Sequence, residues 1–108
     1  MNSVLIWINS APTSSNLCSG FLLAQQMRAQ GRTVSVFLAQ DAVLAGTHGN
    51  QNAPAISALQ AGMTMYALNE DLALRGFAPD ALRDGVRIAD YAQLVELFEQ
   101  HEQVIGAL

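Results

Sequence analysis

Cys18 is the only thiol in the sequence, and it lies where a sulfur atom could react. It follows the apolar run Val4–Ile8 and the turn-forming residues Asn9–Pro12, so it falls in the first turns of the next predicted helix. Backbone N–H groups and the helix dipole would stabilise a thiolate there. An unpaired cysteine is also often a small buried hydrophobe. The sequence therefore predicts either a reactive or a structural thiol at Cys18.

His48 is the candidate partner of this thiol. It lies in the polar loop Gly46–Ala53, which would meet the loop before Cys18 if the first two strands are neighbours. A cysteine–histidine pair is the minimum for an activated thiol, although an isolated loop histidine is often simply solvated. His101 is expected to stabilise the carboxyl end of the last helix. One cysteine and two separated histidines do not match zinc-ligand spacing, so no metal or other cofactor is predicted.

A second set of candidate residues lies where the predicted strands end. Asp41 follows the second strand, and Asn69 and Glu70 follow the third, which contains Tyr66. Parallel α/β sheets bind ligands beyond the carboxyl ends of their strands, so these four residues are predicted to line a strand-end pocket. Glu70 and its neighbour Asp71 also fit a structural role, because acidic side chains stabilise the start of a helix.

The hydroxyl-rich loop Ser10–Asn16 could cradle a phosphate, as flavodoxin-like loops do. However, the chain has no Gly-x-Gly-x-x-Gly after the first strand and no Gly-Lys-Ser/Thr. It also lacks the Gly-x-Ser-x-Gly of hydrolases. A small flavin- or phosphate-binding module is therefore a third hypothesis, behind the two sulfur-based ones developed below.

The elements that must position these residues alternate between short apolar runs and stretches of helical periodicity. Five strands are expected at Val4–Ile8, Thr33–Leu38, Met63–Ala67, Val86–Ile88 and Val104–Ile105. Helices are expected over about Leu17–Gln30, from Pro54 to before Gly62, over Glu70–Arg75, and after the capping pair Asp90 and Gln93. The pattern predicts one α/β domain over residues 1–108, with a mostly parallel five-stranded sheet and helices on both faces.

Composition limits the partners that the chain can have. Its 108 residues include no lysine and carry a net charge of −4, which argues against direct binding of nucleic acid or of a membrane surface. No signal peptide or membrane span is expected, and a lone thiol fits the reducing cytoplasm. Only 13% of residues are charged, and Leu22 and Leu23 lie off the apolar stripe of the first helix. Part of the surface is therefore expected to be covered by another chain.

The segment Tyr66–Gly76, which reads YALNEDLALRG, resembles the segment after the third strand in the DsrE/DsrF/DsrH family of sulfur-relay proteins. The DsrH/TusB type is the most similar at this segment. Val36–Val43 resembles the family's second strand and its Asp-Gly-Val turn, with Ala42 in the place of the usual glycine. Asp90-Tyr91 and the apolar helix after it resemble the corresponding DsrH-type segment. The likeness extends from about Val4 to Ile105.

This resemblance implies a compact α/β fold, cytoplasmic trimers or hexamers of identical or related DsrE-family subunits, and sulfur carried as a cysteine persulfide. The sulfur would pass to a downstream acceptor protein, in tRNA thiolation or in sulfur oxidation. In the DsrE/TusD type, the sulfur-carrying cysteine lies just after the third strand. Here Leu68 and Asp71 occupy those positions, and neither can carry a persulfide. The resemblance thus favours an accessory or structural subunit, with a sulfurtransferase-like carrier that uses Cys18 as the alternative.

Overall fold

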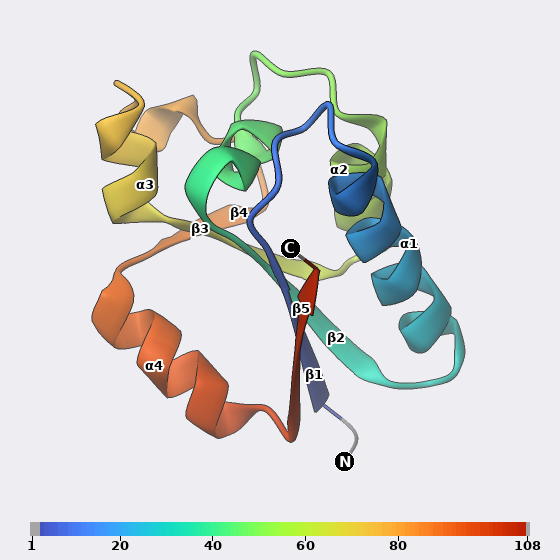
Figure 1. The fold of residues 1–108 in the computed structure, drawn as a ribbon. Coiled ribbons are helices and arrows are strands. Elements are labelled where there is room, and N and C mark those ends of the chain that lie inside the picture. Colours follow the sequence, from blue (N-terminus) through green and yellow to red (C-terminus); the bar gives the residue numbers. More distant parts are fainter. Residues whose placement is uncertain (1–2, 108) are drawn as a thin grey trace.

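A parallel five-stranded sheet forms the centre of the computed structural model, which describes residues 3–107 (Figure 1). The strand order is β4-β3-β2-β1-β5, and every neighbouring pair is parallel. The strands are β1 (Ser3–Ile8), β2 (Thr33–Leu38), β3 (Thr64–Leu68), β4 (Val86–Ala89) and β5 (Gln103–Ala107). The helices are α1 (Ser15–Ala29), α2 (Ala53–Gln60), α3 (Asn69–Leu74) and α4 (Tyr91–Gln100), with 3₁₀ helices η1 (Gln40–Gly46) and η2 (Pro79–Ala81). The predicted α/β class and sheet are confirmed.

The last strand is longer than its apolar residues indicated. The sequence predicted only Val104–Ile105, whereas β5 pairs with β1 over all five of its positions, from Gln103 opposite Val4 to Ala107 opposite Ile8. The extra residues are polar or small, so hydrophobicity does not mark them. They are extended because the strand is hydrogen-bonded to β1 along its full length. The other predicted strand ends are correct to within one residue at β3 and β4.

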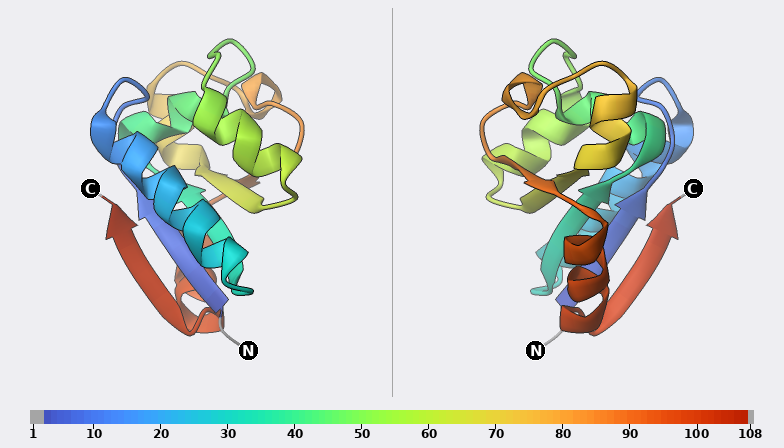
Figure 2. Two further views of the ribbon diagram at one scale, coloured as in Figure 1. Left: turned by 90° about the vertical axis from the view of Figure 1, so that its right-hand side faces the viewer. Right: turned by 90° about the vertical axis from the view of Figure 1, so that its left-hand side faces the viewer.

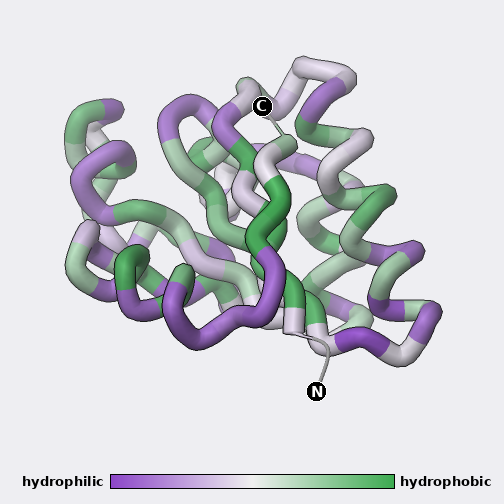
Figure 3. Tube along the Cα trace, turned by 60° about the horizontal axis from the view of Figure 1, so that its bottom comes forward, coloured by the Kyte–Doolittle hydropathy of each residue, from purple (hydrophilic) through white to green (hydrophobic). Residues whose placement is uncertain are grey.

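One face of the sheet is covered by α1 and α2 (Figures 1 and 2). The hydroxyl of Ser14 caps α1 by accepting a hydrogen bond from the backbone N–H of Asn16 at 3.1 Å. The predicted stripe of Leu17, Phe21 and Ala24 is buried against the strands. Figure 3 shows hydrophobic residues in the strands and hydrophilic residues in the turn from α1 to β2.

The opposite face is covered by α4. Its predicted capping box is present, since Asp90 and Gln93 each accept the other's backbone N–H through their side chains. Leu94 and Leu97 are buried on the sheet. This helix and the shorter α3 leave β5 open at its outer side in both views of Figure 2. In the described part of the chain, no helix is long and apolar enough to cross a membrane.

His101 lies at the carboxyl end of α4, as predicted. Its Nδ1 is 2.7 Å from the carbonyl oxygen of Leu97, and its Nε2 is 3.1 Å from the hydroxyl of Ser35 in β2. The imidazole thus ties the end of the helix to the sheet. These contacts give His101 a structural role.

Candidate functional site

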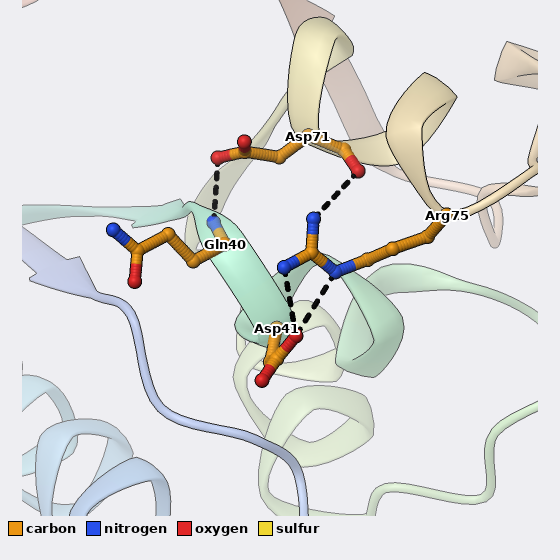
Figure 4. A network of polar contacts seen from close by, with 4 residues as sticks. All are labelled: Gln40, Asp41, Asp71 and Arg75. Atoms are coloured by element: carbon orange, nitrogen blue, oxygen red, sulfur yellow. Dashed lines mark hydrogen bonds and ion pairs between the residues drawn. The ribbon is translucent and has the colours of Figure 1, made fainter.

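Asp71 connects the carboxyl ends of β2 and β3. It lies in the first turn of α3, is only 9% exposed, and accepts the backbone N–H of Gln40 at 2.6 Å through its Oδ2 (Figure 4). Gln40 has a φ of 50°, in the left-handed region that residues other than glycine rarely adopt. The carboxylate therefore holds a sterically unfavourable turn at the end of β2. The neighbouring acid Glu70, which the sequence predicts for the strand-end pocket, takes no part in this contact.

An ion pair one helical turn later joins α3 to η1. Nε and Nη2 of Arg75 both donate to Oδ1 of Asp41, at 3.0 and 2.7 Å, and its Nη1 donates to the carbonyl oxygen of Asp71 at 2.9 Å (Figure 4). The side chain of Asp41 is 59% exposed. Asp41 is thus engaged with Arg75. It lines neither of two cavities that lie beside β4. The four-residue spacing of Asp71 and Arg75 was a signal in the sequence for contacts along one face of α3.

The other predicted pocket residues, Tyr66 and Asn69, line two neighbouring cavities on the α4 side of the sheet. The cavity at Tyr66 has a volume of about 270 Å³, and the one at Asn69 about 200 Å³. The two cavities share Ile88, Ala89 and Gln93. The structure therefore divides the predicted strand-end pocket into an ion-paired side at η1 and a hollow side between β4 and α4.

Glu70 lies between α3 and α4. Its Oε2 is 3.5 Å from the backbone nitrogen of Tyr91, a long contact for a hydrogen bond. Its Oε1 is shielded from solvent and has no hydrogen-bond partner among residues 3–107. Glu70 is therefore apart from the Asp71–Gln40 contact, although the two acids are adjacent in the sequence.

Cys18 is exposed in the first turn of α1. This position contradicts the alternative of a buried cysteine within the chain. The thiol borders a cavity of about 260 Å³ between α1 and α2. Its other lining residues are Phe21, Leu22, Gln25, Pro54 and Ser57. A thiol at this place can meet a second molecule from solvent, in mainly apolar surroundings.

The structure does not bring His48 to this thiol. β1 and β2 are neighbours, as the pairing hypothesis required, but the loop after η1 is bonded to the segment at Ala81 and Leu82. The backbone N–H of exposed His48 donates to the carbonyl oxygen of Ala81 at 2.9 Å, and Thr47 pairs with Leu82. No contact within residues 3–107 joins His48 to Cys18, and His48 does not line the cavity at the thiol. Nor does this part of the chain contain a cluster of three or more histidine, cysteine or acidic residues that could hold a metal ion.

The comparisons with known proteins agree with this architecture. The family model described as DsrH like protein matches residues 10–104. Among solved structures, the ychN protein from E. coli is similar with a TM-score of 0.85 and 26% identity, over 98% of this chain and 99% of that one. MTH1491 from Methanobacterium thermoautotrophicum, a protein of unknown function, has a TM-score of 0.82 and 17% identity over the same shares, so it shows the fold alone. Comparison with proteins of curated function gave no match.

Proposed function

Because the chain belongs to the DsrH-like family, we propose that it is an accessory or structural subunit of a sulfur-relay assembly. The end of β3 carries the proposal. Leu68, which is 2% exposed, and Asp71, which binds the backbone of Gln40, occupy the positions where the DsrE/TusD type has its sulfur-carrying cysteine. These side chains pack and hold a turn, and neither offers a sulfur atom. The subunit would then contribute surfaces to the assembly rather than a sulfur-carrying thiol.

In this proposal the chain works in the cytoplasm as a trimer or hexamer of identical or related DsrE-family subunits, beside a downstream sulfur-acceptor protein. The surface supports association, because several large apolar side chains are exposed. These are Leu22, Leu74, Phe77, Ile88, Tyr91, Val95 and Val104. With a net charge of −4 and no lysine, the chain has little to attract nucleic acid directly.

A persulfide carrier that uses Cys18 is the second candidate, and the exposure of this thiol favours it. The Cys18 thiolate would attack the outer sulfur of a donor persulfide. A new S–S bond would form at Cys18, the S–S bond of the donor would break, and the donor would leave as a thiolate. The persulfide would border the apolar walls of the adjacent cavity, such as Phe21 and Pro54.

Incubation with glutathione persulfide, followed by intact-mass measurement, separates the two candidates. For an accessory subunit we expect no stable gain of a sulfur atom, because the chain has no thiol after β3 and no charged residue lines the cavity at Cys18 to activate its thiol. A gain of one sulfur atom that Cys18→Ser abolishes would overturn the accessory proposal in favour of the carrier. Cys18→Ser is a suitable control because Cys18 is exposed, so the free energy of unfolding should change by less than about 0.5 kcal/mol.

A further inference from the structure

The outer edge of β5 is a row of backbone groups that no other element of the described chain covers. β5 pairs with β1 on its inner side only, as the last strand of the sheet. Gln103, Val104 and Gly106 are exposed, and both views of Figure 2 show the outer side of the strand free. Such an edge is a template for pairing with another strand.

β5 also lacks the features that protect strand edges. It contains no charged residue and no proline, and its pairing with β1 runs without a bulge. Figure 3 shows the chain changing from hydrophilic to hydrophobic as it enters this strand. The opposite edge strand, β4, is shorter and carries exposed Arg87. A charge on an edge strand opposes pairing, so only the β5 edge is open to it.

We propose that β5 pairs antiparallel with β5 of a second copy of this chain, across a twofold axis at Ile105. In this register Ile105 lies opposite its own copy, and Val104 of each chain lies opposite Gly106 of the other. Val104 is 40% exposed, and Gly106 has no side chain, so each valine fills the space that the opposite glycine leaves. Trp7 pairs with Gly106 inside the chain and would border the same place.

Charge and symmetry favour pairing of β5 with its own copy over pairing with β4 of another molecule. Because Gln103–Ala107 is uncharged, the strand meets no like-charge repulsion from its own copy. At its start, Glu102 and Arg32, whose Nη2 donates to Gln103 at 2.6 Å, have opposite signs. Pairing of β5 with β4 of another molecule would leave free edges and grow into filaments, whereas the twofold contact closes on itself.

This interface does not depend on sulfur transfer or on the accessory role. It would join two single chains by one self-complementary contact, or two trimers into a hexamer by three copies of that contact. A failure of the interface and a failure of the proposed function are therefore measured separately.

Sedimentation equilibrium of Val104→Lys tests the interface. A lysine on the edge places two charges beside the twofold axis, so we expect the assembly mass to halve at a concentration where the unsubstituted chain is associated. Gln100→Lys adds the same charge at an exposed position of α4 and should leave the mass unchanged. An unchanged mass for Val104→Lys, with a native far-UV circular dichroism spectrum, would overturn the proposal. So would a monomeric unsubstituted chain at micromolar concentration.

Cross-linking tests the register without an added charge. In a Cys18→Ser background, Ile105→Cys places two thiols directly opposite each other, at about 4.5–5.5 Å between Cβ atoms. We expect it to form a disulfide-linked dimer on mild oxidation. Val104→Cys is the matched control, since its two copies would lie on a diagonal about 7–8 Å apart, beyond ready bridging. Equal cross-linking of the two variants, or none at Ile105→Cys, would contradict the twofold register.

Discussion

Replacing Asp71 with alanine is expected to lower the free energy of unfolding by about 3 kcal/mol. The Asp71 carboxylate is 9% exposed and accepts the N–H of Gln40 at 2.6 Å, and a hydrogen bond to a charged group contributes about 1.5–3 kcal/mol. The N–H of Gln40 would also lose its partner, at a residue whose φ of 50° is unfavourable without support. For a domain of this size, Tm should fall by roughly 12 °C or more.

Asp41→Ala is the matched control for this prediction. It also removes one carboxylate at the strand ends, but the Asp41 side chain is 59% exposed and its ion pair with Arg75 lies at the surface. An exposed pair of this kind contributes about 1 kcal/mol or less. Urea unfolding of both variants gives the comparison. Equal losses for Asp71→Ala and Asp41→Ala would show that the Asp71–Gln40 contact does not hold the turn.

Replacing Gln40 with glycine in the Asp71→Ala background checks the physical cause. Glycine adopts a positive φ without steric cost, so it should recover up to about 1 kcal/mol of the loss. If the loss arose only from the missing charge of Asp71, Gln40→Gly would recover nothing.

The sequence was sufficient for the elements whose signal is local. Val4–Ile8 is apolar at every position, and this marks a strand covered on both faces without reference to the rest of the chain. Asp90 and Gln93 mark the start of α4 for the same reason, because a capping box lies within one helical turn. β5 was underestimated because its extended conformation depends on β1, about a hundred residues earlier.

The polar contacts at the strand ends depend on long-range geometry and could not be predicted in the same way. Asp71 and Gln40 are 31 positions apart. The sequence offered Glu70 and Asp71 as adjacent acids, and adjacent positions of a helix point about 100° apart. Which of the two faces β2 is therefore decided by how α3 packs on η1. The position of His48 could not be predicted for the same reason. It depends on the packing of its loop against Ala81 and Leu82, more than thirty positions later.

The helix α1 and the edge strand β5 approach most closely at Gly20, and a side chain there is expected to be unfavourable. A Cβ atom at Gly20 would lie 2.9 Å from Cβ of Ala107 and 3.0 Å from Cδ1 of Ile8. Overpacking of this kind costs about 1–3 kcal/mol, whereas alanine gains up to about 1 kcal/mol over glycine in a helix. We therefore expect Gly20→Ala to lower the free energy of unfolding by up to about 2 kcal/mol.

Two further variants show whether the close approach to β5 is the cause. Gly49→Ala is the matched control, because a Cβ atom there meets nothing within 4 Å, and the stability should change by about 0.5 kcal/mol or less. Adding Ala107→Gly to Gly20→Ala removes the nearest carbon, so the double variant should lose less than the two single losses combined, with a coupling of at least about 0.5 kcal/mol. Additive losses would mean that α1 moves aside instead of pressing on β5. Coupled losses would mean that α1 and β5 stay in close contact at Gly20 and Ala107, so that the packing of α1 fixes the place of β5 at the edge of the sheet.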